Sequence, residues 1–293
     1  MKRISISFFI LILLCAAGCT KNKETETARF TVISSFYPVY IIAKNVSHNV
    51  PGVTIRNLTP PMTGCLHDYS VTADDMKKLE TADLLIINGA GMESFMQTVI
   101  GRYPSLRTAA LSKGIPTIKE NHLENPHLWV SLSTYAEMIK NCTDALCAAD
   151  PVYEKQYRAS GDTYLKKVYA LKKELDAKLR PYKGRQIITF HEAFPYFARE
   201  YGLRIAAVIE REPGTEPSAK ELAETIELVK KSKIKILFTE PQYPSASAEV
   251  IAKESGAKIL VLDPIVTGPD DNDAYLSIMR SNGEVLQKAF SQE

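Results

Sequence analysis

The chain has 293 residues, of which 45% are hydrophobic and 24% are charged, and its formal net charge is +2. This length suffices for two domains that each bury a core, and the composition argues against a disordered chain. The balance of 36 basic and 34 acidic residues gives no electrostatic reason to expect nucleic acid as a partner.

The N-terminus has the pattern of an exported protein. Two basic residues precede an apolar run from Ile4 to Leu14, and small residues follow up to Cys19. That run is too short to span a bilayer, so residues 1–18 are predicted to be a secretory signal peptide. The ending Ala-Ala-Gly-Cys resembles a bacterial lipobox, which implies a lipid on Cys19 and a polar tether over residues 19–29. We therefore expect the protein at the outer face of the cell membrane; a plain secretory signal is the alternative.

Residues 30–150 alternate between strand and helix patterns. β-branched apolar runs indicate buried strands, and Thr72 followed by Asp74 and Asp75 indicates a capped helix start. The expected strands cover 30–35, 53–58 and 83–89, and the expected helices cover 37–46, 72–82 and 92–100. This alternation predicts an N-terminal α/β lobe with a parallel sheet.

The same order returns over residues 182–293. Strands are expected at QIITF (186–190), RIAAVIE (204–210), KILFTE (235–240) and KILVLD (258–263), with helices between them, for example over 217–232. The fold class is therefore predicted to be α/β, with two Rossmann-like lobes of the doubly wound type.

Residues 151–181, between the lobes, are predicted to form one connecting helix. Apolar residues recur every three or four positions, with charge on the opposite face: Leu165, Val168, Leu171, Leu175 and Leu179. A helix from Val152 to Arg180 would be roughly 43 Å long, and Gly161 would be its weakest position. We expect this connector to hold the lobes more rigidly than a flexible hinge would.

Three of the five histidines lie in loops between predicted strands and helices, where open α/β sheets bind ligands. His67 lies in a Pro- and Gly-rich loop, His127 lies in ENPHLWVSLS, and His191 directly follows QIITF. Asp263 ends KILVLD and has the same setting. Three imidazole nitrogens and one carboxylate oxygen suit a four-coordinate zinc ion. The four side chains are therefore candidate metal ligands.

Neighbouring residues have two interpretations each. Glu240 is either a further oxygen ligand or a hydrogen-bond acceptor for a ligand, and Glu192 is expected to orient a ligand rather than act as a base. Cys65, two residues before His67, is either a thiolate ligand or a structural thiol. Cys142 and Cys147 are expected to be buried free thiols.

These segments resemble the solute-binding lipoproteins of zinc and manganese ABC transporters. The resemblance is carried by GCLHDYSVTADDMKKLETADLLIINGAGMESF, NPHLWVSL, ITFHEAFPYFAREYGL, FTEPQYPS and VLDPI, followed by YLSIMRSN. It implies that His67, His127, His191 and Asp263 ligate the ion in a cleft between two lobes joined by one long helix. It also implies an ABC permease as the partner, and we expect the binding protein to be a monomer.

The identity of the ion has two alternatives. The sequence departs from many members by having Cys65 and Leu66 before the first histidine, and from many zinc-specific members by lacking a long histidine-rich loop before the second. Manganese-selective members, however, tend to have a glutamate in place of His191, and nitrogen ligands favour zinc. Zinc is therefore the expected cargo and manganese the alternative.

Two other classes of function fit the same residues less well. A zinc hydrolase would leave one position open for water, whereas Asp263 as the fourth ligand closes the site. A cell-surface adhesin with a structural metal would also carry a lipid anchor. We expect metal capture and no enzymatic activity.

Overall fold

The computed structural model describes residues 29–60, 66, 69–120, 123–209, 217–232, 234–242 and 246–291. The predicted signal peptide and the lipid attachment at Cys19 lie outside the described residues. Within these ranges, no helix is both long enough and apolar enough to cross a membrane.

The first lobe is built on a parallel four-stranded sheet with the order β2-β1-β3-β4. Its strands are β1 (Phe30–Ser34), β2 (Val53–Asn57), β3 (Leu84–Ile87) and β4 (Arg107–Ala110), and its helices are α1 (Tyr37–Val46), α2 (Ala73–Glu80) and α3 (Gln97–Ile100). The side chain of Thr72 accepts a hydrogen bond from the Asp75 amide, and the Asp75 side chain bonds to the Thr72 backbone in return. This reciprocal cap fixes the start of α2.

The second lobe repeats this topology. Its parallel sheet has the order β8-β7-β9-β10, so in both sheets the first strand lies between the second and the third. The strands are β7 (Gln186–Thr189), β8 (Arg204–Val208), β9 (Ile236–Thr239) and β10 (Lys258–Val261), and the helices are α6 (Pro195–Tyr201), α7 (Ala219–Ser232) and α8 (Ala246–Ser255). In each sheet the chain reverses its winding direction between the two central strands, which is where such sheets bind ligands.

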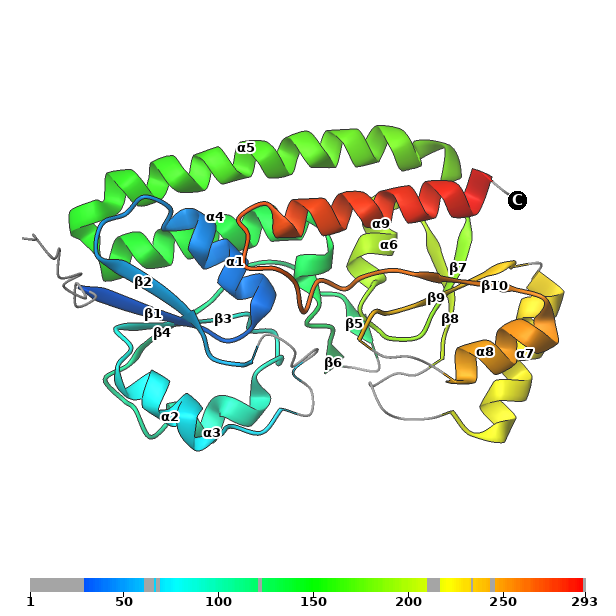
Figure 1. Ribbon diagram of the computed structural model, residues 1–293, viewed down its shortest axis with the longest axis horizontal. Helices are drawn as coiled ribbons and strands as arrows, with labels where there is room; N and C mark the ends of the chain where they lie inside the picture. The colour runs from blue at the N-terminus through cyan, green and yellow to red at the C-terminus, as the bar shows by residue number, and fades with distance from the viewer. Residues whose placement is uncertain are drawn as a thin grey trace, which may run out of the picture.

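One long helix joins the lobes. In Figure 1, α5 (Glu154–Leu179) runs across the top of both lobes, with α4 (Leu132–Ala149) and α9 (Ala274–Ser291) beside it. With 26 residues, α5 is about 39 Å long. A Cβ on Gly161 would lie 2.5 Å from Thr143 Oγ1, so glycine permits the close approach of α5 to α4.

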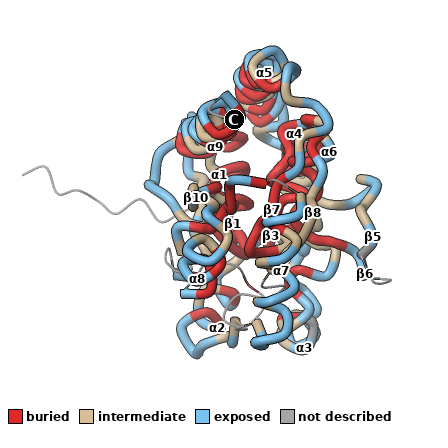
Figure 2. Tube along the Cα trace, turned by 90° about the vertical axis from the view of Figure 1, so that its right-hand side faces the viewer, coloured by how far each residue is buried: buried red, intermediate tan, exposed pale blue. Residues whose placement is uncertain are grey.

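A continuous hydrophobic core crosses from one lobe to the other. One cluster contains Ile42 of α1, Leu175 of α5, Phe197 of α6 and Tyr275 of α9. Figure 2 shows buried residues on the inner faces of α5 and α9 and exposed residues on their outer faces. The shared core restricts independent motion of the lobes, because opening them would expose apolar surface to water.

The predicted two-lobed α/β fold is confirmed, with differences in three places. The connecting helix begins at Glu154, because Pro151 opens a 3₁₀ turn before it. The helix expected over 92–100 is wrong in extent, since only a 3₁₀ turn at Ser94–Met96 and the four-residue α3 form there. Strand β4 and the hairpin of β5 (Lys119–Glu120) and β6 (Leu123–Glu124) were not expected from the sequence, because they lack long apolar runs.

Candidate metal centre

The structure brings together two of the predicted ligands, His127 and His191. Their rings are nearly perpendicular, with centroids 4.8 Å apart. His127 precedes the 3₁₀ turn that leads into α4, and His191 follows the carboxyl end of β7. In the sequence, His127 therefore lies before α5 and His191 lies after it. Their residue exposures are 2% and 3%. A buried, paired imidazole environment of this kind suits a divalent metal ion.

Glu240 orients the His191 ring. Glu240 directly follows β9, and its two carboxylate oxygens lie 3.0 and 3.3 Å from His191 Nδ1. Because a carboxylate only accepts hydrogen bonds, the proton belongs on Nδ1. Nε2 then carries the ring's lone pair, which is the arrangement found in histidine ligands backed by a carboxylate.

Asn125 orients the His127 ring, and this role was not expected from the sequence. Its Oδ1 accepts from the His127 amide at 3.0 Å and lies 3.1 Å from His127 Nδ1. Its Nδ2 donates to the main-chain oxygen of Glu192 at 2.9 Å, which fixes the amide orientation and connects the two histidine loops. The Asn-Pro dipeptide before His127 was the available signal, since asparagine often bonds to the backbone two residues on.

Asp263 follows β10 in a tightly held turn. The Asp263 amide donates to Asn282 Oδ1 at 2.9 Å, and Asn282 Nδ2, from α9, donates to the Asp263 carbonyl at 2.8 Å. Asp263 Oδ1 accepts a hydrogen bond from the Ile265 amide at 2.7 Å. Burial raises the pKa of Asp263, and hydrogen bonds from Ile265 and Gln242 oppose that change. Trp129 Nε1 donates to the carbonyl of Pro264 at 2.7 Å, which links this turn to the His127 loop.

The other predicted residues are not all placed. His67 and Cys65 lie outside the described residues. Among those described, no three His, Cys, Asp or Glu side chains meet in a group that could hold a metal ion. The expectation for Cys142 and Cys147 is confirmed, since both thiols are free and buried.

A buried hydrogen-bonded cluster around Glu93 lies behind the His127 loop and was not expected from the sequence. Glu93 accepts hydrogen bonds from Ser35 Oγ and from the amides of Asn88 and Gly89, at 2.7, 2.7 and 3.0 Å. Burial raises the pKa of Glu93. Asn88 Nδ2 in turn donates to the Pro126 carbonyl at 3.0 Å, so the cluster supports the backbone that carries His127.

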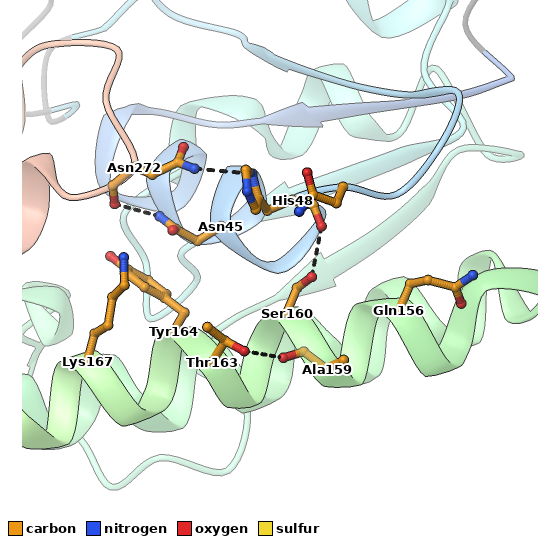
Figure 3. Close-up of a pocket in the computed structure, with 10 residues that line it drawn as sticks. Asn45, His48, Gln156, Ala159, Ser160, Thr163, Tyr164, Lys167 and Asn272 are labelled. Atoms are coloured by element: carbon orange, nitrogen blue, oxygen red, sulfur yellow. Dashed lines mark hydrogen bonds between the residues drawn. The ribbon is translucent and has the colours of Figure 1, made fainter.

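A polar surface pocket of about 450 Å³ lies elsewhere, between α1, α5 and the chain entering α9, and Figure 3 shows its side chains. None of the predicted metal ligands lines it. His48, expected to be a surface residue, is exposed here. Its Nδ1 hydrogen-bonds with Asn272 Nδ2, and its carbonyl accepts a hydrogen bond from Ser160 Oγ. Hydrogen bonds among the lining residues thus hold the chain before α9 against α1, and α1 against α5.

Comparison with known proteins identifies one family. A model of the family ZnuA, described as the periplasmic zinc-uptake complex component A, matches residues 32–289. The zinc-binding lipoprotein AdcA of Streptococcus pneumoniae is 28% identical over 323 aligned positions, covering 100% of this chain and 62% of AdcA. The chain therefore spans less than two thirds of the length of that relative.

Two further proteins are similar over nearly their full lengths. The iron-binding protein YfeA of Yersinia pestis is 26% identical, with 96% of this chain and 93% of YfeA covered. The solved structure of the solute-binding protein FpvC of Pseudomonas aeruginosa with Mn²⁺ matches with a TM-score of 0.82 and 27% identity. That match covers 90% of this chain and 99% of FpvC.

Proposed function

The chain belongs to the ZnuA family, and from that premise we propose that it captures a divalent metal ion outside the cell membrane and delivers it to an ABC permease. The buried His127–His191 pair is the observation that carries this proposal. Each ring has its Nδ1 at an oxygen acceptor, so both Nε2 atoms are suited to bind the same cation.

The proposed ligand set is His67, His127, His191 and Asp263. His67 would come from the loop between β2 and α2, and Asp263 from the turn after β10. Asp263 as the fourth ligand would complete the shell and leave no position for an activated water. This closed shell supports a binding protein rather than a hydrolase.

Zinc is the proposed cargo. Three imidazoles and one carboxylate provide the ligand types and the coordination number that zinc prefers, and the similar AdcA is named a zinc-binding lipoprotein. Manganese is the alternative, because FpvC, of the same fold, was solved with Mn²⁺. Binding of both ions at one site is compatible with the proposed transport function.

The proposed cycle involves only a small closure of the lobes. The segment 264–273, which leads from β10 to α9, is bound to α1: Tyr37 Oη donates to the Pro269 carbonyl at 2.9 Å, and Lys44 Nζ contacts Asp270 Oδ1 at 2.6 Å. This segment starts directly after Asp263, so it ties that turn to the first lobe. Together with the shared core and α5, it supports a rigid pair of lobes.

We propose the following division of the chain: signal peptide 1–18, lipidated tether 19–29 anchored through Cys19, lobes 30–150 and 182–293, and connecting helix 151–181. The lipoprotein name of AdcA and the periplasmic description of the family support a position outside the cytoplasm. Mass spectrometry of the membrane-extracted protein would test the anchor, since an unmodified Cys19 or an intact signal would contradict it.

Equilibrium dialysis with elemental analysis tests the proposed function. The wild-type protein should hold one zinc ion, and His191→Ala should lose it while retaining the circular dichroism spectrum of the folded chain. His48→Ala is the matched control, because His48 is exposed and lies in the other pocket. Wild-type protein that binds neither zinc nor manganese in stoichiometric amount would overturn the proposal.

A further inference from the structure

Trp129 is in contact with the His127 ring and with the turn that carries Asp263. It follows His127 by two residues, and the centroids of the two rings are 5.1 Å apart at an interplanar angle of 50°. Phe36 packs edge-on against the same indole at 5.0 Å. Trp129 Nε1 donates to the carbonyl of Pro264, the residue after Asp263, at 2.7 Å. Because the side chain is fully buried, these contacts fix its orientation.

One peptide group connects the Trp129 hydrogen bond with the Asp263 carboxylate. This group joins Pro264 to Ile265, and its carbonyl accepts from Trp129 Nε1 at 2.7 Å. Its N–H donates to Asp263 Oδ1, also at 2.7 Å. Because the group is planar and trans, its C=O and its N–H point in opposite directions. A tryptophan that fixes the carbonyl therefore also fixes the N–H that holds the carboxylate.

The conformation of this turn depends on such support. Ile265 has a φ of +63°, in the left-handed region that a β-branched residue rarely adopts. A residue in this region keeps its conformation only where the surrounding contacts over-determine it. Asn282 fixes the amide and the carbonyl of Asp263, and Trp129 fixes the peptide group that follows. The two residues together hold the carboxylate in one direction.

A second hydrogen bond fixes the backbone of Trp129. Tyr275 Oη, in the first turn of α9, donates to the Trp129 carbonyl at 2.6 Å. The Tyr275 ring stacks on Tyr135 of α4, with the ring centroids 3.5 Å apart, and all three aromatic side chains are fully buried. Because α9 also carries Asn282, this helix supports the Asp263 turn both directly and through Trp129.

We propose that Trp129 is a positioning residue that aims the Asp263 carboxylate at the ion bound by His127. This inference rests on the proposed function, in which both side chains are ligands. The indole fixes the carboxylate of the second lobe, and the Trp129 backbone is continuous with that of His127 in the first lobe. The two ligands are thus fixed relative to each other before the metal binds. Ligands that are already ordered reduce the cost of binding, so the contact raises metal affinity without a large movement of the lobes.

A double-variant cycle with zinc as the probe tests this role. Trp129→Phe keeps a buried aromatic ring but removes the N–H donor. Its zinc affinity, measured by competition with a chelating indicator, should fall about tenfold. In the Asp263→Ala background the same substitution should change the affinity less than about twofold, because no carboxylate remains to be aimed. An equal loss in both backgrounds would show a purely structural effect and overturn the proposal.

Hydrogen exchange provides a second measurement that needs no metal. In Trp129→Phe the Ile265 amide should exchange about tenfold faster, because its peptide group has lost its other hydrogen bond. Unchanged exchange would count against the proposal. Tyr275→Phe keeps the indole and removes one hydroxyl, and it serves if Trp129→Phe does not fold. It should lower zinc affinity about threefold, and this loss should likewise disappear with Asp263→Ala.

Tyr157→Phe is the matched control. Tyr157 is another fully buried aromatic residue and donates to Asp150 Oδ2 at 2.8 Å. Asp150 caps the end of α4 opposite to the His127 loop, about 27 Å along the 18-residue helix. The control should lower stability and leave zinc affinity unchanged.

The same measurements separate this inference from the proposed function. If Asp263→Ala binds zinc as tightly as wild type does, the positioning role is overturned while capture by the histidines stands. Wild-type protein that binds neither zinc nor manganese would overturn the capture function itself.

Discussion

Replacing Glu240 tests the hydrogen-bonded support of His191 most directly. Both side chains are almost fully buried, and both Glu240 oxygens lie within 3.3 Å of His191 Nδ1. Glu240→Gln keeps an oxygen acceptor for the Nδ1 proton but removes the negative charge. The ring should therefore keep its tautomer and become a weaker donor to the metal.

The size of the loss in zinc affinity follows from the contact between Glu240 and His191. A charge-assisted hydrogen bond is about twice as strong as a neutral one, and loss of such a partner costs roughly 10- to 100-fold in metal affinity. We expect Glu240→Gln to weaken zinc binding about tenfold, which corresponds to about 1.4 kcal/mol. Glu240→Ala also leaves a buried N–H without an acceptor and should approach a hundredfold loss.

Isothermal titration with zinc, in competition with a chelator, measures both variants. Glu249→Gln, an exposed position on α8, is the control and should bind as wild type does. Unchanged affinity in both Glu240 variants would refute the supporting role. Complete loss of stoichiometric zinc in Glu240→Gln would show instead that Glu240 coordinates the ion, the alternative that the sequence left open.

Three further predictions concern stability. Arg29 holds the pKa of Asp150 below its ordinary value. A pKa that is lower in the folded state than in the unfolded state stabilises the protein at pH values above the unfolded pKa of about 3.9. This stabilisation is lost as the pH falls through the pKa of the folded state. Asp150→Asn should therefore cost about 1–2 kcal/mol at pH 7, and urea titrations should show this cost shrinking below about pH 4; a cost independent of pH would contradict it. Gly161→Ala should destabilise by about 1–2 kcal/mol through its contact with Thr143, and thermal melts should show recovery in the double variant with Thr143→Ala. Zinc at a hundred times its dissociation constant should add about 2.7 kcal/mol to the unfolding free energy, an increase that calorimetry should not detect in His191→Ala.

Much of the fold was predictable because its signals are local. The strands β1, β3, β7 and β9 are apolar runs whose buried character is evident in the sequence, and Thr72 marks the start of α2 by its own hydrogen bond. By contrast, β4 has the sequence RTAA and is partly exposed, so its strand conformation depends on pairing with β3. Such edge strands have little propensity of their own to reveal them.

The candidate site was predictable in its residue types and only partly in its contacts. The settings of His127 and His191 at loops near strand ends indicated a common site, and the structure places their rings side by side. The orienting role of Asn125 was not predicted, and Glu240 had two possible roles. Both depend on distances between side chains, which sequence spacing does not supply.

The sequence by itself determined the alternation of strands and helices, the long connector and the residues able to bind a cation, because periodicity, capping and side-chain chemistry are properties of short segments. Only the tertiary structure decided which side chains meet. The ends of β7 and β9 are neighbours because the sheet pairs those strands, and that pairing brings Glu240 to His191. Similarly, packing of α9 brings Asn282 to Asp263 and fixes the turn after β10.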